Sequence, residues 1–187
     1  MNYTALDFET ANAKPGGACS LGLAKFNGDG KLIGTWYSLI RPVIPYFNPY
    51  MSAIHGLDSS KCLCSPEFDR LWPEILDFIQ DDVLVAHNAQ FDMRVLKGCL
   101  DCYGLGLPVN PYACTLQISR KVWPCLENHK LTTLSQHFGF DYKAHYALDD
   151  AINCGLLLAK AGNGHLGNLH SFECFLEQIH LNIRFLQ

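Results

Sequence analysis

The segment YTALDFETAN, residues 3–12, has the character of a first buried strand, yet it carries two carboxylates. Its apolar and β-branched residues predict a strand over residues 3–8. Because successive strand side chains point to opposite faces, Asp7 and Glu9 share one face. Like charges repel, and burying an unpaired carboxylate is costly. The rest of the chain must explain why a strand carries this pair.

Length and composition indicate one soluble domain. The chain has 187 residues, of which 49% are hydrophobic and 17% charged, as in ordinary globular proteins. No apolar run reaches the about 18–20 residues that span a bilayer, so we expect no membrane association. The start, MNYTALDFET, lacks the basic and apolar regions of a signal peptide. We therefore expect a cytoplasmic protein.

The nine cysteines are most simply reduced thiols in such a protein. Cys99 and Cys102 form a C-x-x-C pair, and Cys62 and Cys64 lie close together. A structural zinc site usually needs a second ligand pair at suitable spacing, and none is evident. A zinc- or thiol-based function is therefore the weakest of the alternatives.

The formal charge of −4 is not that of a protein that coats nucleic acid. A polyanionic substrate remains compatible with this charge, because bound divalent cations can dominate the local potential. We expect no tight grip on long stretches of nucleic acid.

The pattern of elements predicts an α/β fold, a mixed β-sheet flanked by helices. Three successive antiparallel strands open the chain, and the NGDG turn at residues 27–30 joins the last two. A proline, Pro73, is placed near the start of one helix. The expected strands are residues 3–8, 18–26, 32–40, 83–86 and 112–115, and the expected helices are residues 49–54, 68–79, 90–103, 116–122, 130–138, 148–161 and 169–186.

We expect residues 1–164 to form the main domain and residues 165–187 a helical extension. Gly162 and Gly164 would stop the preceding helix. Apolar residues recur at helical intervals in the extension, which would pack on the domain or at an interface with a second copy.

Further carboxylates follow the later strands. Asp92 closes VLVAHNAQFD, residues 83–92, and HYALDDA, residues 145–151, holds His145, Asp149 and Asp150. Each acid taken alone favours a helix N-terminus electrostatically, and a lone histidine is usually a solvated or hydrogen-bonded one. Strand ends and helix starts can converge on one sheet edge, however, and gathered carboxylates suit Mg²⁺ or Mn²⁺.

Three motifs now occur in order: Asp7-Phe8-Glu9, an H-N-x-x-F-D run at residues 87–92, and an H-x₄-D pair, His145 and Asp150. With them, the chain closely resembles the DEDDh family of 3′→5′ exonucleases, on the ribonuclease H-like fold. That family includes the epsilon subunit of DNA polymerase III, ribonuclease T and oligoribonuclease. The resemblance covers residues 3–161.

The resemblance implies an enzyme that hydrolyses phosphodiesters with two divalent cations, Mg²⁺ or Mn²⁺. Asp7 would bridge the two cations, Glu9 and Asp150 would complete the first site, and Asp92 would help to hold the second. His145 would be the general base that activates water. Nucleoside 5′-monophosphates would leave from the 3′ ends of single-stranded DNA.

Neighbouring residues on a helix point about 100° apart. Family spacing selects Asp150, and Asp149 would then be a cap or a supporting residue.

The resemblance also implies contacts to the terminal nucleotide. The backbones of Phe8 and Thr10 would approach the last sugar, and Ile54 and His55 belong to a stretch that lines the terminal-base pocket. Phe91 could stack on a base. For Phe8, Ile54 and Phe91, core packing is an equal alternative. His87 and Asn88 are expected to shape the turn and cap the helix.

One stretch departs from the common family form. Many members have D-x-E-T-T-G, whereas this chain has DFETANAKPGG, residues 7–17, which changes the surroundings of the substrate end. Residues 119–124 and 128–130 supply basic and aromatic groups for phosphates further along the strand, or simply a solvated face.

Several alternatives stay open at this stage. RNA or short oligoribonucleotides could replace DNA, with recognition of the 2′-hydroxyl. A non-catalytic module that kept the fold is the competing class. The expected protein partner is either a second copy of the chain, in a homodimer, or a polymerase.

Overall fold

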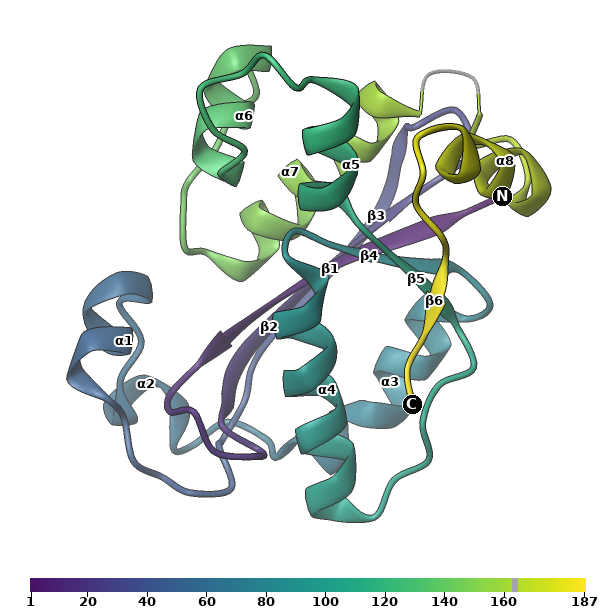
Figure 1. Cartoon of the computed structure of the whole chain (residues 1–187). Helices are drawn as coiled ribbons and strands as arrows, with labels where there is room; N and C mark the ends of the chain where they lie inside the picture. Colours follow the sequence, from purple (N-terminus) through teal and green to yellow (C-terminus); the bar gives the residue numbers. More distant parts are fainter. Residues whose placement is uncertain (163–164) are drawn as a thin grey trace.

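The computed structural model describes residues 1–162 and 165–187, and these build a six-stranded sheet with helices on both faces (Figure 1). The spatial order is β3-β2-β1-β4-β5-β6. Its strands are β1 (Tyr3–Thr10), β2 (Ala18–Phe26), β3 (Leu32–Leu39), β4 (Val83–Ala86), β5 (Pro111–Cys114) and β6 (Arg184–Phe185). The helices are α1 (Pro49–His55), α2 (Ser59–Cys62), α3 (Phe68–Ile79), α4 (Ala89–Tyr103), α5 (Thr115–Val122), α6 (Leu131–Phe138), α7 (Ala147–Ala161) and α8 (Leu169–Gln178).

The sheet is mixed, as predicted. β1, β2 and β3 form an antiparallel meander, whereas β4 pairs in parallel with β1 on one side and with β5 on the other. The carboxyl ends of β1, β4 and β5 therefore meet at one edge. That edge is where the carboxylates of the first two motifs were expected.

Alternation along β1 sorts its side chains between two cores. Leu6 and Phe8 pack with α3 and α4 on one face, whereas Tyr3 and Ala5 pack with α5, α7 and α8 on the other. Because the period of a strand is two, Asp7 continues the row of Tyr3 and Ala5. It therefore faces α7 at the point where the core ends.

Two glycines let α7 lie directly on the sheet. A Cβ atom at Gly22 of β2 would come within 2.3 Å of the Ala147 carbonyl oxygen. A Cβ atom at Gly155 of α7 would come within 2.1 Å of the Phe26 ring. The Tyr3 hydroxyl donates to the Gly155 carbonyl at 3.1 Å. This close approach fixes the first turn of α7 beside the end of β1.

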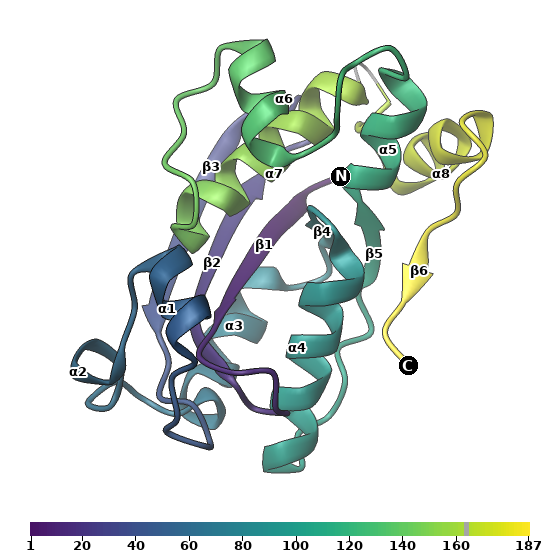
Figure 2. The ribbon, with the colours of Figure 1, turned by 60° about the vertical axis from the view of Figure 1, so that its left-hand side comes forward.

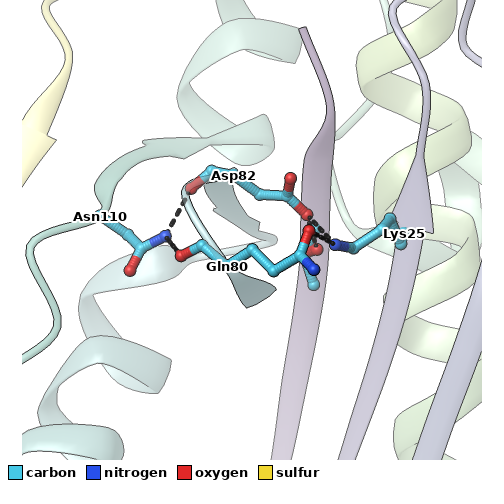
Figure 3. Close-up of polar contacts among 5 residues, drawn as sticks. Lys25, Gln80, Asp82 and Asn110 are labelled. Atoms are coloured by element: carbon cyan, nitrogen blue, oxygen red, sulfur yellow. Dashed lines mark hydrogen bonds and ion pairs between the residues drawn. The ribbon is translucent and has the colours of Figure 1, made fainter. Parts of the chain in front are cut away.

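A buried carboxylate, Asp82, ties the opposite end of the sheet together (Figure 3). Its side chain pairs with Lys25 of β2 at 3.0 Å and accepts a hydrogen bond from the Thr4 hydroxyl. The Asn110 side chain donates to the backbone carbonyls of Asp82 and Gln80 at 2.8 and 2.9 Å. The buried charge of Asp82 is thus compensated by an ion pair and a hydrogen bond.

The prediction of one helix over residues 169–186 is wrong. α8 ends at Gln178, and Arg184 and Phe185 pair antiparallel with β5. The backbone turns at His180, which has a φ of 58°. The open edge of β5 offers hydrogen-bond partners to the last residues, so pairing replaces further helix. The predicted boundary at residue 164 lies outside the described residues.

The extension rests on the domain. Phe172, Phe175 and Leu176 of α8 join the core that α7 covers. The chain start lies beside this helix in Figure 1, and the Met1 amino group donates to the Leu166 carbonyl at 3.2 Å.

The placement of Pro73 was also wrong, because it lies in the middle of α3 and not near its start. Proline removes the N–H that would bond the carbonyl four residues earlier, at Asp69. Pro73 lies on the exposed side of α3, where water can satisfy that carbonyl.

Among the residues described, no helix has the length and apolar character needed to cross a bilayer.

We expect Gly22→Ala to lower the free energy of unfolding by about 1–3 kcal/mol, the usual cost of overpacking. The new methyl group would push against the backbone of Ala147 at the start of α7. Urea denaturation measures this change. Gly34→Ala on β3 is the matched control, because its Cβ atom would meet only the Phe78 ring at 3.7 Å. Equal stability of the two variants would contradict the packing account.

Candidate active site

Three of the predicted carboxylates come together at the end of β1. Ligand oxygens of Asp7, Glu9 and Asp150 all lie within 4.8 Å of one another. The strand period places Asp7 and Glu9 on the face toward α7, and Asp150 lies in the first turn of that helix. Segments more than 140 residues apart in sequence thus build one acidic group.

The fourth carboxylate, Asp92, lies beside this group and is not one of its three members. It lies in the first turn of α4 and is 1% exposed. Its Oδ1 accepts a hydrogen bond from the Phe8 backbone N–H at 3.1 Å. That bond fixes Asp92 against β1, between the two residues of the Asp7-Glu9 pair.

Burial and mutual repulsion raise the pKa values of the carboxylates. Burial contributes most to the pKa of Asp7, which lies well above its usual range, and the charges of Asp92, Asp150 and Glu9 add to it. Burial and then Asp150 raise the pKa of Glu9 to about 7. Burial raises the pKa of Asp92 to about 8. Without a cation, this group holds protons at neutral pH.

The contrast with Asp82 shows what the group lacks. Asp82 has Lys25 at 3.0 Å (Figure 3), whereas across residues 1–162 and 165–187 no ion pair joins Asp7, Glu9, Asp92 or Asp150 to a lysine or arginine. Carboxylate oxygens without a counter-charge are the ligands that Mg²⁺ and Mn²⁺ take. The donor set therefore fits divalent cations.

Asp150 supplies a further sign of this fit. Its Oδ1 accepts a hydrogen bond from the Tyr142 hydroxyl. Its Oδ2 is buried and has no hydrogen-bond partner among the described residues. Burial raises the pKa of Asp150 as well. Unsatisfied buried oxygens are uncommon and require an explanation, which a bound cation gives.

Sequence reasoning missed Tyr142. It lies in the irregular segment before α7, eight residues from Asp150, where no helical or strand period links the two. The H-x₄-D spacing starts only at His145. No signal in the sequence marks this contact.

His145 lies on the rim of the same site. Its side chain is exposed and lines the cavity together with Asp7, Glu9 and Asp150. Its backbone has a φ of 62°, in the left-handed region that residues other than glycine rarely adopt. The imidazole is thus beside the acidic group without being buried in it.

The cavity has a volume of about 840 Å³ and is lined by side chains of different chemistry. The acidic group contributes Asp7, Glu9 and Asp150 to its wall. Polar and basic side chains also line it: Arg120, Asn128, His129, Lys130 and Thr132. Phe91 and Leu116 lie along the same cavity and supply apolar surface.

The three apolar residues predicted to contact the terminal nucleotide differ in burial: Phe8 is buried, Phe91 is half-buried and Ile54 is exposed. The Phe8 ring lies in the core against Phe68, at a centroid distance of 6.4 Å, so core packing holds for this side chain. Ile54 is 58% exposed, so core packing is wrong for it. Phe91 is half-buried and lines the main cavity and a second one of about 370 Å³, which Thr10 also lines.

His55 is fixed beside the end of β1. Its Nε2 lies 3.2 Å from the Thr10 carbonyl oxygen, and its Nδ1 accepts the Leu57 N–H at 3.0 Å. Helices α1 and α2 lie at this far end of β1 (Figure 2). Of the stretch from residue 54 to residue 57, His55 is therefore the residue that contacts the end of β1.

His87 and Asn88 shape the turn before α4. The two ring nitrogens of His87 lie 3.0 Å from the Thr115 hydroxyl and 2.9 Å from the His129 carbonyl oxygen. Burial lowers the pKa of His87 to about 4. Asn88 stands at the N-cap position with a φ of 73°, but its side chain makes no capping bond, so that part of the expectation is wrong.

The strand order and the helices on both faces of the sheet are those of the ribonuclease H-like fold. The chain belongs to the exonuclease (RNase_T) family, whose family model matches residues 4–158. The predicted DEDDh resemblance and fold class are thereby confirmed.

Two polymerase proteins are among the similar sequences. A PolC-type DNA polymerase III of Halalkalibacterium halodurans is 35% identical over 131 residues, which are 70% of this chain and 9% of the polymerase. The epsilon subunit of DNA polymerase III from Aquifex aeolicus is 28% identical over 152 residues, 80% of this chain and 74% of that subunit. The chain thus spans about a tenth of the length of the PolC-type relatives.

Solved structures share the fold. Exonuclease X in complex with 5′ overhanging duplex DNA has a TM-score of 0.73 at 23% identity, covering 92% of this chain and 98% of that one. The nuclease domain of 3′hExo, a DEDDh family member bound to rAMP, has a TM-score of 0.75 at 15% identity, covering 89% and 94%.

We expect the metal-free protein to lose stability as the pH rises from about 5 to about 8. Folded Glu9 and Asp92 keep their protons up to pKa values of about 7 and about 8. The unfolded chain releases them near 4, so the folded state binds more protons and its free energy of unfolding falls with pH. Thermal unfolding in EDTA measures the slope.

Glu9→Gln tests the cause. A glutamine has no proton to lose, so this variant should show a shallower fall of the melting temperature over the same range. Identical slopes would contradict the assignment of raised pKa values to the acidic group.

Proposed function

We propose that this chain is a metal-dependent 3′→5′ exonuclease that releases nucleoside 5′-monophosphates from the ends of single-stranded DNA. One observation carries the proposal: oxygens of Asp7, Glu9 and Asp150 lie within 4.8 Å of one another, and none of the three forms an ion pair with a lysine or arginine of the described residues. They line a cavity that Arg120 and Lys130 also line. Family membership supports the class of reaction.

Asp7, Glu9 and Asp150 would hold one divalent cation, and Asp7 with Asp92 a second. The family to which the chain belongs uses divalent metal ions, and the choice between Mg²⁺ and Mn²⁺ is part of the proposal. Such cations neutralise the carboxylates and, as Lewis acids, stabilise the charge that develops on a reacting phosphate. The hydrogen bond from the Phe8 N–H would hold Asp92 in position to bind the second cation.

His145 would take the proton of the attacking water. An imidazole can accept a proton near neutral pH, and its exposed place on the rim lets it pass that proton to solvent. The negative charge of the nearby carboxylates would stabilise the imidazolium that forms during the reaction.

The cavity would position the strand. Arg120 and Lys130 would contact phosphates, and Phe91 would stack on a base, an interaction worth about 1–3 kcal/mol that tolerates any sequence. Thr10, which lines the second cavity, and His55, which contacts its carbonyl oxygen, would meet the terminal nucleotide together with Ile54. The net charge of −4 agrees with a grip on only a few nucleotides.

Relatives favour DNA and a polymerase partner. Both the PolC-type and epsilon relatives are DNA polymerase III proteins. The rAMP-bound neighbour keeps an exoribonuclease as the second candidate. The homodimer stays a prediction.

A time course on 5′-labelled single-stranded DNA and RNA, with Mg²⁺, Mn²⁺ or EDTA, tests the proposal. We expect a metal-dependent ladder that shortens from the 3′ end, with DNA degraded faster. Faster RNA cleavage would favour the second candidate. Absence of cleavage from a folded, metal-binding protein would contradict both.

Asp7→Asn should lower kcat at least about 100-fold, since loss of one electrostatic group at a reacting centre commonly costs 10²–10³. The same variant should melt at a higher temperature at pH 8 in EDTA, because a neutral amide avoids the cost of burying or protonating this carboxyl group beside its acidic neighbours. Asp149→Asn is the matched control and should keep its activity. Full activity of Asp7→Asn would refute the assignment.

A further inference from the structure

The segment between α6 and α7, residues 139–146, joins two parts of the site. It carries Tyr142 and His145 and leads into the helix of Asp150. The Asn153 side chain donates to the carbonyls of Asp141 and Asp149 at 3.1 and 2.9 Å. One buried amide of α7 thus holds the segment immediately before Tyr142.

The Tyr142 ring is anchored as well. It packs against Leu131 and Leu134 of α6 and Leu157 of α7, beside Phe138 and Phe140. Because the ring is partly buried against this cluster, its contacts with α6 and α7 restrict the position of its hydroxyl. The hydroxyl is therefore a fixed donor and not a freely moving one.

The hydroxyl donates to one oxygen of Asp150 and leaves the other alone. Oδ1 accepts the Tyr142 hydrogen bond, and Oδ2 is buried without a partner among the described residues. A carboxylate held at one oxygen cannot rotate freely about its last bond. The second oxygen is then fixed in place as well, and Asp150 offers one of its two oxygens to the group with Asp7 and Glu9, whose ligand atoms lie within 4.8 Å of one another.

We propose that Tyr142 is a positioning residue that orients Asp150 for divalent-cation binding. The inference rests on the proposed function, because it takes the acidic group as the cation site. Partners that orient a metal ligand typically contribute 10–100-fold in metal affinity. Tyr142 also lines the cavity beside His145, so the same bond holds the segment that carries the imidazole.

Tyr142→Phe removes the hydroxyl and keeps the ring packing. We expect a rise of about 10-fold or more in the Mn²⁺ dissociation constant, measured by calorimetry with the full chain. Unchanged thermal unfolding in EDTA would show that the fold is intact. The Mn²⁺ concentration for half-maximal nuclease activity should rise by the same factor, and excess Mn²⁺ should restore most of kcat with KM for DNA unchanged.

Tyr146→Phe is the matched control. Tyr146 belongs to the same segment, but its ring packs on Tyr37 at a centroid distance of 5.0 Å, and the hydroxyl that donates to Asp150 is that of Tyr142. Its Mn²⁺ affinity should equal that of the wild type. Asp7→Asn gives the baseline for Mn²⁺ bound elsewhere on the surface.

The outcomes separate the two claims. Equal Mn²⁺ affinity of Tyr142→Phe and the wild type would overturn the role of Tyr142 and leave the cation site standing. A loss of activity that excess Mn²⁺ does not restore would also overturn it, because it would point to a general loss of structure. Failure of the wild type to bind Mn²⁺ above the Asp7→Asn baseline would refute the proposed function, and this inference with it.

Discussion

The burial of four carboxylates close together at one strand end is the constraint on which this structure depends. Asp7, Glu9, Asp92 and Asp150 lack an ion-pair partner within the described residues, and burial raises the pKa of each. The same fold shows how a buried carboxylate is satisfied, because Asp82 has Lys25 and Thr4 (Figure 3). The protein therefore keeps an unfavourable charge arrangement at one end of its sheet and a compensated one at the other. Such local strain is characteristic of functional sites.

The rest of the fold keeps these groups from moving apart. Gly22 and Gly155 let α7 lie against β2 and β1, so Asp150 cannot retreat without breaking core contacts. The Phe8 N–H holds Asp92, and the Tyr142 hydroxyl holds Asp150. Packing energy spread over two cores thus offsets a local electrostatic cost.

Much of this arrangement follows from the sequence. The two-residue period of β1 places Asp7 and Glu9 together, and the parallel pairing of β1 and β4 brings the H-N-x-x-F-D turn to the same edge. Contacts between irregular segments could not be predicted, since no period connects Tyr142 to Asp150. The pairing of β6 with β5 was missed because a strand of two residues depends on an edge that exists only in the folded sheet. The ring of Phe8 was left undecided, although the same alternation that pairs Asp7 with Glu9 turns it into the opposite core.

The most direct test is a crystal of the protein grown at pH 8 with Mn²⁺ and a nucleoside 5′-monophosphate, with diffraction recorded at the manganese absorption edge. The account predicts anomalous peaks bonded to oxygens of Asp7, Glu9 and Asp150, with the nucleotide phosphate beside them. Manganese found only elsewhere on the surface, with these carboxylates still bare, would contradict it.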